Sequence, residues 1–259
     1  MRNSLVVFLL SFMLLFPLTG RAESLILVAD SWCPYNCAEG STAPGYLIEI
    51  ATEALALSNF SVTYEEMNWT RAIHQVKTGK AHGLVGAVLA EVPDFVFPKH
   101  WLGIAPNAYF TLKGSLWKPT DKDAFSDIRL GVTRDYDYGG TLQPWIDTHK
   151  DTPLVQEAQG TNALQTNLQK LRYGRIDVLV DEKQAVLLRA KEMGMDQLIR
   201  FAGEDPLRPA EDRIYIAFSP ADPRSPSYAT ALDKGLETLR KTGRLSAILH
   251  KYNIDDWEK

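Results

Sequence analysis

The stretch VKTGKAHGLV at residues 76–85 decides the fold, because it returns in outline as LRYGRIDVLV at residues 171–180. Both copies read as a helix end, a glycine that stops the helix, a basic residue and an apolar strand. The copies lie 95 positions apart (171 − 76 = 95), about the length of a compact lobe. A chance match is the alternative, since this order of elements is common. Similar strand–loop–helix segments precede both copies, so the repeat predicts two similar α/β lobes.

Apolar strands and amphipathic helices alternate on both sides of this repeat. The expected strands cover residues 25–29, 61–67, 84–89, 107–112, 129–133, 155–158, 178–180 and 213–218. The expected helices cover residues 46–57, 70–77, 141–149, 162–173, 228–242 and 245–252. Thr70 and Thr161 are the expected N-caps of two of these helices. The alternation predicts an α/β protein with largely parallel sheets.

The order of these elements also predicts how the chain divides. We expect one lobe to comprise residues 23–108 and 214–259, and the other to comprise residues 109–213. If the chain returns to the first lobe near residue 213, two strands connect the lobes. Two lobes on two connectors form a hinge with a cleft between them.

Composition excludes several classes of protein. The chain has 259 residues, of which 45% are hydrophobic and 23% are charged, and this balance is too apolar for a disordered chain. Its 28 Lys and Arg against 32 Asp and Glu give a net charge of −4. A nucleic-acid-binding role therefore has no electrostatic support.

An uncharged N-terminal stretch predicts export. After Met1 and Arg2, the apolar segment at residues 5–16 is too short to span a bilayer, and Gly20 and Ala22 supply the small residues of a cleavage site. We expect a signal peptide at residues 1–22, cleaved after Ala22, and a periplasmic mature protein. A retained membrane anchor is the alternative.

The two cysteines, Cys33 and Cys37, lie in the segment SWCPYNC at residues 31–37. Their spacing does not match a thioredoxin-type motif, and no second cysteine pair completes a zinc site. In an oxidising compartment a local disulfide is the simplest interpretation, with two free thiols as the alternative. The bond would close a very short loop, so it would shape that loop rather than stabilise the whole fold.

Catalytic motifs are missing from the sequence. There is no Gly-x-Ser-x-Gly elbow, no Walker loop, no Gly-x-Gly-x-x-Gly and no His-Glu-x-x-His. The five histidines, at positions 74, 82, 100, 149 and 250, share no ligand-like spacing. We expect no cofactor, no metal and no enzyme activity, although a fold by itself does not exclude activity.

The order and spacing of several short motifs resemble the bacterial periplasmic solute-binding proteins of family 3, the polar-amino-acid type. The motifs are Pro34-Tyr35, GYLIEI at residues 45–50, WTR at residues 69–71, GRID at residues 174–177 and the C-terminal stretch at residues 235–252. The resemblance covers essentially the whole mature chain. It implies two Rossmann-like α/β lobes on a two-strand hinge, the type II periplasmic-binding-protein arrangement, with a ligand cleft between the lobes.

One departure from this family concerns the carboxylate of the ligand. The resemblance implies a Thr-x-x-Arg-like segment after the third strand, whose Arg pairs with the α-carboxylate of an amino acid. Here the corresponding stretch is LAEVP at residues 89–93, and Val92, near the Arg position, cannot form a bidentate ion pair. His82 also replaces an Asp of the family. A standard α-amino acid is therefore in question unless another Arg substitutes.

Ligand contacts in such folds come from loops at strand ends that face the cleft. The candidate ligand-binding residues of the first lobe are Trp32, Tyr35, Trp69, Arg71, Gly86 and Ala87. The candidates of the second lobe are Arg134, Tyr136, Tyr138, Gly139, Thr161, Asp181 and Glu182. The alternatives are core packing for the aromatic and small residues, and solvated surface positions for the two arginines.

The chemistry of these candidates indicates a small organic solute, because Trp and Tyr combine flat apolar faces with a polar edge. Arg71 at a helix start, and Arg134 in a loop before a helix, would favour an anionic group. The family resemblance implies that a carboxylate after the strand at residues 178–180 holds the ligand's amino group. Glu182 fits that spacing better than Asp181.

We therefore expect a monomer that captures a small polar solute, amino-acid-like or carboxylate, and delivers it to an ABC permease. The first alternative is an orphan receptor that signals through a membrane sensor partner. The second is a small exported lyase or hydrolase on the same fold, with Asp181 or Glu182 as its general acid–base group.

Overall fold

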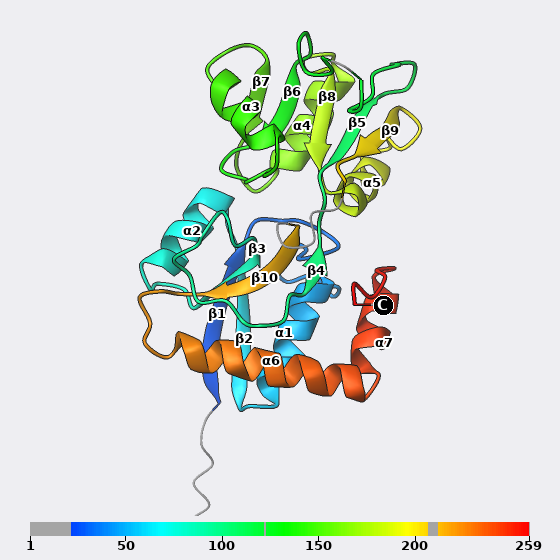
Figure 1. The fold of residues 1–259 in the computed structure, drawn as a ribbon. Helices are drawn as coiled ribbons and strands as arrows, with labels where there is room; N and C mark the ends of the chain where they lie inside the picture. Colours follow the sequence, from blue (N-terminus) through cyan, green and yellow to red (C-terminus); the bar gives the residue numbers. More distant parts are fainter. Residues whose placement is uncertain (1–21, 122, 207–211, 259) are drawn as a thin grey trace, which may run out of the picture.

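The computed structural model describes residues 22–121, 123–206 and 212–258. Two five-stranded sheets lie one above the other, and helices pack beside each sheet (Figure 1). We call the half that contains β1 lobe 1 and the half that contains β6 lobe 2. The expected signal peptide lies outside the described residues, apart from Ala22.

Lobe 1 is built on a sheet with the strand order β2-β1-β3-β10-β4. Its strands are β1 (Glu23–Ala29), β2 (Phe60–Glu66), β3 (Gly83–Ala87), β4 (Gly103–Ile104) and β10 (Arg213–Phe218). Its helices are α1 (Tyr46–Ala56), α2 (Trp69–Lys77), α6 (Ser225–Lys241) and α7 (Arg244–Lys251). β1 pairs in parallel with β2 and β3, whereas β10 is antiparallel to β3 and β4. One apolar core joins this sheet to its helices.

Lobe 2 is built on a sheet with the strand order β7-β6-β8-β5-β9. Its strands are β5 (Ala108–Leu112), β6 (Leu130–Thr133), β7 (Val155–Ala158), β8 (Val178–Asp181) and β9 (Ile199–Glu204). Its helices are α3 (Leu142–His149), α4 (Ala163–Arg172) and α5 (Lys183–Glu192). Successive side chains of β5 point to opposite faces, so Tyr109 and Phe110 belong to separate apolar clusters.

The two sheets have the same topology, which is the structural form of the sequence repeat. In each, a central strand (β1 or β6) lies between two parallel neighbours, and an antiparallel strand (β10 or β5) comes next. Gly79 follows α2 with a φ of 72°, and Gly174 follows α4 with a φ of 63°. Glycine reaches this left-handed conformation without the steric cost of a Cβ. The prediction of two similar α/β lobes is confirmed.

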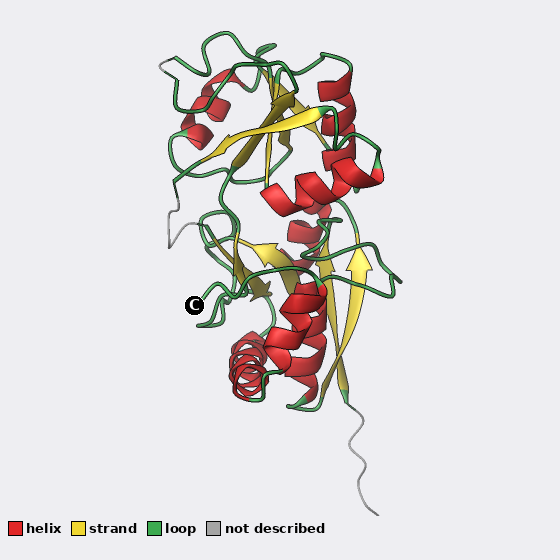
Figure 2. Ribbon diagram, turned by 90° about the vertical axis from the view of Figure 1, so that its right-hand side faces the viewer, coloured by secondary structure: helices red, strands yellow, loops and turns green. Residues whose placement is uncertain are grey.

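Two chain connections join the lobes, and the described ends of the second are hydrogen-bonded to the first. The Ala105 N–H donates to the Asp212 carbonyl at 2.8 Å, and the Asp205 N–H donates to the Asn107 carbonyl at 2.9 Å. The view turned by 90° shows loops in much of the region between the lobes (Figure 2). The two-strand hinge predicted from the sequence is therefore present.

The sheets are mixed rather than largely parallel, which corrects the sequence expectation. The chain crosses the hinge twice, and each crossing supplies the sheet it enters with an antiparallel strand, β5 or β10. Neither strand belongs to a strand–helix–strand unit of its own lobe, so parallel pairing is not imposed on it.

Helix starts differ from expectation at two places. Asn68, and not Thr70, is the N-cap of α2, and its side chain accepts a hydrogen bond from the Arg71 N–H. Asn162, and not Thr161, is the N-cap position of α4, and no side chain caps that helix. Helix α5 was not expected from the sequence, because its buried side chains are small, namely Ala185, Val186 and Ala190. Strands β4 and β9 were also missed.

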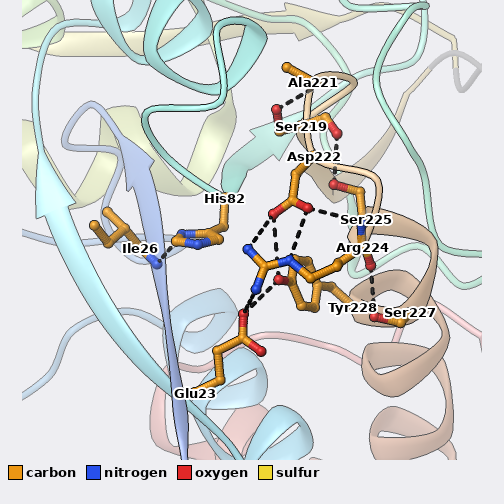
Figure 3. A network of polar contacts seen from close by, with 10 residues as sticks. All are labelled: Glu23, Ile26, His82, Ser219, Ala221, Asp222, Arg224, Ser225, Ser227 and Tyr228. Atoms are coloured by element: carbon orange, nitrogen blue, oxygen red, sulfur yellow. Dashed lines mark hydrogen bonds and ion pairs between the residues drawn. The ribbon is translucent and has the colours of Figure 1, made fainter.

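A polar network at the far end of lobe 1 ties the start of β1 to the start of α6 (Figure 3). The Glu23 carboxylate accepts hydrogen bonds from Arg224 at 2.5 Å and from the Tyr228 hydroxyl at 2.7 Å. Just before β3, His82 Nδ1 accepts from the Ile26 N–H at 2.9 Å. This end of the sheet is turned away from lobe 2 (Figure 1), so the network anchors lobe 1 and does not line the cleft.

Candidate ligand-binding site

A cavity of about 70 Å³ lies between the lobes, beyond the carboxyl ends of the parallel strands. A water molecule needs roughly 10–15 Å³ of such space, so the cavity has room for several waters or a small solute. Crevices at the carboxyl ends of strands are where open α/β sheets bind ligands. The lining residues are Asp30, Trp32, Asn36, Trp69, Val85, Gly86, Val88, Glu91, Ala105, Pro106, Asn107, Tyr136, Asp137, Tyr138, Asp181, Glu182 and Ile214.

A disulfide-closed loop after β1 forms one wall of this cavity. Cys33 and Cys37 are bonded to each other, which confirms the local disulfide and excludes the free-thiol alternative. The Trp32 N–H donates to the Asn36 carbonyl at 2.8 Å. The indole of Trp32 stacks on the ring of Tyr35, with centroids 4.1 Å apart. Because Tyr35 is buried, this stack holds the indole against the cavity.

Two hydrogen bonds between lining residues cross from one lobe to the other. Nε1 of Trp32 in lobe 1 donates to Oδ1 of Asp181 in lobe 2 at 3.2 Å. The hydroxyl of Tyr136 in lobe 2 donates to Oδ2 of Asp30 in lobe 1 at 2.9 Å. Both bonds join a strand end of one lobe to a strand end or loop of the other. The structure is therefore a closed arrangement of the two lobes.

Further contacts across the boundary lie at the mouth of the cavity. The Thr70 hydroxyl donates to the Asp135 carboxylate. The ring of Trp69 meets that of Tyr136 edge to face, with centroids 5.7 Å apart. An outer groove beside these residues is lined by Asp30, Asn68, Trp69, Thr70, Thr133, Arg134, Asp135, Gln159 and Gly160.

The cavity is acidic, and burial changes how its carboxyl groups ionise. Burial raises the pKa of Asp30 and that of Asp181 from 3.8 to about 7. It raises the pKa of Glu91 from 4.5 to about 8, and it also raises the pKa of Glu182. Asp137 is the fifth carboxyl group in the lining. A positive charge that entered the cavity would favour the ionised form of each group.

The side-chain donors around the cavity are largely engaged by acceptors of the protein itself. Trp69 Nε1 donates to Glu91 Oε1 at 2.5 Å, in addition to the bonds of Trp32 and Tyr136 described above. The Asn107 amide donates to the Tyr138 carbonyl at 2.7 Å. Among the described residues, neither Lys nor Arg lines the cavity. When the lining carboxyl groups are ionised, as a cationic ligand would favour, the lining therefore offers a ligand acceptors rather than donors.

Asn36 has one polar atom without a partner. Its side chain is 1% exposed, and its Nδ2 donates to the Asp30 carbonyl at 2.5 Å. Its Oδ1 has no hydrogen-bond partner among the described residues. That oxygen lies 3.7 Å from the place where a Cβ on Gly86, another lining residue, would stand. The orphaned acceptor thus lies beside Gly86, another residue of the cavity lining.

The structure brings together seven of the residues predicted from the sequence. Those that line the cavity are Trp32, Trp69, Gly86, Tyr136, Tyr138, Asp181 and Glu182. Those that do not line it are Tyr35, Arg71, Ala87, Arg134, Gly139 and Thr161. Ligand binding by any of these residues stays a prediction.

The two arginines expected to favour an anion do not reach the cavity. Arg71 is exposed on α2. Arg134 is exposed at the outer groove, where it pairs with Glu157 at 2.8 Å and bonds to Gln159. Their charges therefore lie outside the cavity lining, in contrast to the five carboxyl groups inside it.

Sequence reasoning missed several lining residues, above all Asp30, Asn36, Glu91 and Asp137. Asp30 ends the apolar run of β1, and a polar residue directly after a buried strand was the signal that could have found it. Glu91 lies in the very segment in which the sequence shows no Arg. Asn36 lies between the two cysteines, and nothing in the sequence indicates that its side chain faces the cleft. The position of its amide follows from the structure of the disulfide-closed loop.

The described residues contain neither a metal-binding cluster nor a helix that could cross a membrane. Among residues 22–121, 123–206 and 212–258, no group of three or more His, Cys, Asp or Glu is arranged to hold a metal ion. In the same part of the chain, every helix is too short or too polar to cross a membrane.

Comparisons with known proteins identify the fold. No family model matches the sequence, and no curated protein matches it. A histidine kinase sensor domain with similarity to periplasmic binding proteins is 18% identical, with a TM-score of 0.71 over 90% of this chain and 96% of that one. An ancestral arginine-binding protein bound to arginine is also 18% identical, with a TM-score of 0.68 over 90% of this chain and 99% of that one.

A third solved structure comes from work on glutathione import by GshT and a cystine ABC importer of Streptococcus mutans. It is 19% identical, with a TM-score of 0.68 over 89% of this chain and 94% of that one. At such identities the likeness concerns the fold. The chain has the two-lobe, periplasmic-binding-protein-like fold that the sequence predicted, and the cavity lies in the cleft of that fold.

Proposed function

We propose that the chain is an exported solute-binding protein that closes its two lobes on a small solute. The observation that carries this proposal is the cavity between the lobes, lined from both sides and bridged by the Trp32–Asp181 and Tyr136–Asp30 hydrogen bonds. A solute in this place contacts both lobes only when they are closed. Its binding energy therefore shifts the population toward the closed state.

The hinge supports such a motion. Only two connections join the lobes in the described part of the chain, and they are hydrogen-bonded to each other near Ala105 and Asn107. Each lobe has a core of its own, so a rotation about the connections need not disturb either core.

A membrane partner then recognises the closed state. In the transport version, which the family resemblance implies, the partner is an ABC permease. In the sensing version the partner is a membrane sensor, and a histidine kinase sensor domain has the same fold. A permease gene beside this one would favour transport, and a signalling gene would favour sensing.

Catalysis is less well supported by the same geometry. Glu182 Oε2 accepts from the Ala185 N–H at 2.9 Å as the N-cap of α5. Asp181 Oδ1 accepts from Trp32 and, at 2.7 Å, from the Glu182 N–H. Both candidate acid–base groups thus hold structural hydrogen bonds. A bound solute should be recovered unchanged after long incubation, and a product would favour the lyase or hydrolase alternative.

Thermal unfolding tests the binding proposal. The purified chain, exported and processed by the expressing cells and freed of carried-over ligand, is unfolded with a panel of amino acids, amines, small carboxylates and peptides. A ligand at about 100 times its Kd adds roughly 2.7 kcal/mol of stability, or several degrees in Tm. A panel without any shift contradicts the proposal.

A pair of variants shows whether the ligand occupies the cavity. Ala105→Trp fills the lined space, since Ala105 is a lining residue, and should abolish the ligand-dependent shift. Ala38→Trp places the same ring on an exposed position outside the lining and should preserve it. Equal shifts in both variants would place the ligand elsewhere.

A further inference from the structure

The charge of the cavity identifies the chemical class of its solute, an inference that rests on the proposed function. Five carboxyl groups line the cavity, from Asp30, Glu91, Asp137, Asp181 and Glu182. Among the described residues no Lys or Arg lines it, and none pairs with any of these five groups. An anion in this space would meet no positively charged side chain among the described residues, and it would oppose ionisation of these carboxyl groups.

The hydrogen-bond donors and acceptors of the cavity lining also favour a cationic solute. The indole N–H groups of Trp32 and Trp69 and the hydroxyl of Tyr136 already donate to lining carboxylates. A carboxylate on the solute would compete with these acceptors for the same donors. A solute that carries several N–H groups instead meets the remaining acceptor capacity of the five carboxyl groups.

The orphaned Oδ1 of Asn36 is an independent sign of a missing donor. Buried side-chain acceptors are normally hydrogen-bonded, because an unsatisfied buried polar atom costs free energy. This oxygen is buried beside the lining residue Gly86 and has no partner among the described residues. A solute N–H group placed in the cavity near Gly86 would satisfy it.

Aromatic rings make the cavity suitable for an organic cation. Trp32, Trp69, Tyr136 and Tyr138 contribute to the lining, together with aliphatic surface from Val85. Ring faces attract ammonium groups electrostatically, and their apolar surface also packs against hydrocarbon. A hydrated metal ion uses neither property.

We propose that the solute is an organic ammonium ion that carries several N–H groups and no carboxylate, such as an alkylamine or alkyldiamine. Its ammonium group lies among Asp30, Asp181 and Glu182, and one N–H reaches Asn36 Oδ1. The hydrocarbon part lies against Trp32 and Trp69.

Ligands of similar size that differ in charge test whether the charge of the solute determines its affinity. Calorimetric titration uses 1,4-diaminobutane, ornithine (the same diamine skeleton with a carboxylate added) and 1,4-butanediol (the same chain length without charge). We expect 1,4-diaminobutane to bind at least tenfold more tightly than ornithine, and 1,4-butanediol not to bind. Choline, a cation without an N–H group, should bind at least tenfold more weakly than the diamine. Tighter binding of ornithine, or of calcium or magnesium ions alone, overturns the inference.

A variant pair ties the effect to the cavity. Asp181→Asn removes one lining charge but keeps an oxygen that accepts from Trp32, and it should weaken diamine binding at least tenfold. Asp94→Asn is the control, because Asp94 is exposed and pairs with Lys77, and it should leave diamine binding unchanged. Equal affinities in the two variants overturn the inference.

Failure of this inference is distinguishable from failure of the proposed function. If an amino acid or a carboxylate stabilises the chain and Ala105→Trp abolishes that effect, the protein is a solute-binding protein of another specificity. If no compound of any charge binds, both proposals fail.

Discussion

The hydroxyl of Tyr136 donates a hydrogen bond of 2.9 Å to Oδ2 of Asp30, a residue 106 positions earlier in the chain and in the other lobe. Asp30 directly follows β1, and Tyr136 lies in the loop after β6. β1 and β6 are the equivalent central strands of the two sheets. The repeat thus brings two equivalent strand ends face to face, and this bond joins them at the cavity.

Replacing Tyr136 by Phe should weaken ligand binding by favouring the open state. In the open state neither protein has this bond, so the substitution destabilises only the closed state. There the buried Asp30 loses its hydroxyl donor, at a cost of about 1–3 kcal/mol. Apparent affinity falls with the closed population, so we expect a loss of roughly 5- to 150-fold. Small-angle scattering should show a larger radius of gyration for the ligand-free variant.

Tyr173→Phe is the control for this variant, because the side chain of Tyr173 is 69% exposed on lobe 2. It should change neither affinity nor radius. Wild-type affinity in Tyr136→Phe would show that the bond to Asp30 does not contribute to closure.

The stability of the ligand-free protein should fall as pH rises from 5 to 8.5. Burial raises the pKa of Asp30 and of Asp181 to about 7 and that of Glu91 to about 8. A folded-state pKa above the unfolded value means that protonation favours the fold, and this contribution is lost as pH rises through the folded pKa. Thermal unfolding between pH 5 and pH 8.5 measures it. A Tm that rises across this window would contradict the pKa assignments.

Affinity for 1,4-diaminobutane should show the opposite dependence on pH. The diamine stays charged across this window, since alkylammonium groups have a pKa of about 10.4. The carboxyl groups become ionised as pH rises, and binding displaces their remaining protons. Asp137 and Glu182 also face the ligand, while Tyr136 and Tyr138 stay neutral because burial raises their pKa values well above the usual range.

Calorimetry at pH 6 and pH 8.5 checks this dependence. We expect affinity at least tenfold weaker at pH 6, with proton release detectable from the difference between two buffers. A pH-independent affinity would mean that these carboxyl groups do not contact the ligand's charge.

Removing the disulfide should affect binding more than folding. The bond between Cys33 and Cys37 closes a loop with a sequence separation of 4. The loss of chain entropy in the unfolded state predicts that such a bond stabilises the fold by about 2 kcal/mol. The same loop holds the indole of Trp32 and the amide of Asn36 at the cavity. The double variant Cys33→Ser/Cys37→Ser should stay folded and lose at least tenfold in diamine affinity. Full affinity with a lowered Tm would show that the bond serves stability alone.

His82 should contribute to the stability of lobe 1 and not to binding. Its Nδ1 accepts from the Ile26 N–H at 2.9 Å (Figure 3), at the end of the sheet that is turned away from lobe 2 (Figure 1). His82→Ala leaves that N–H without its acceptor, so we expect a loss of about 1 kcal/mol and a Tm lower by about 2–4 °C. His74→Ala, on an exposed side chain, is the control. Reduced ligand affinity in His82→Ala would show that this network communicates with the cleft.

The two-lobe fold could be predicted because its determinants are local in sequence. The segments at residues 76–85 and 171–180 each carry a helix end, a glycine stop and a buried strand, and they occupy equivalent places in the two sheets. The strand at residues 213–218 was also predicted with its observed bounds. The elements that were not predicted depend on tertiary context. Helix α5 is an example, because its small buried side chains give only a weak helical periodicity of apolar residues.

The candidate site was predicted only in part, for a physical reason. Trp32, Trp69, Tyr136 and Asp181 were found because aromatic and acidic residues at strand ends are conspicuous. The acidic character of the cavity was not predicted from the sequence, because it depends on which charged side chains point into the cavity. Arg134 turns outward to Glu157, whereas Glu91, from the segment without an Arg, lines the cavity.

The most direct test of the account is a crystal structure of the chain grown with 1,4-diaminobutane. We predict that the diamine lies between the lobes, with one ammonium nitrogen about 3 Å from carboxylate oxygens of Asp30 or Asp181 and its methylene chain against Trp32. A diamine on the outer surface with the cavity empty, or a ligand in the cavity that directs a carboxylate at these residues, would contradict it.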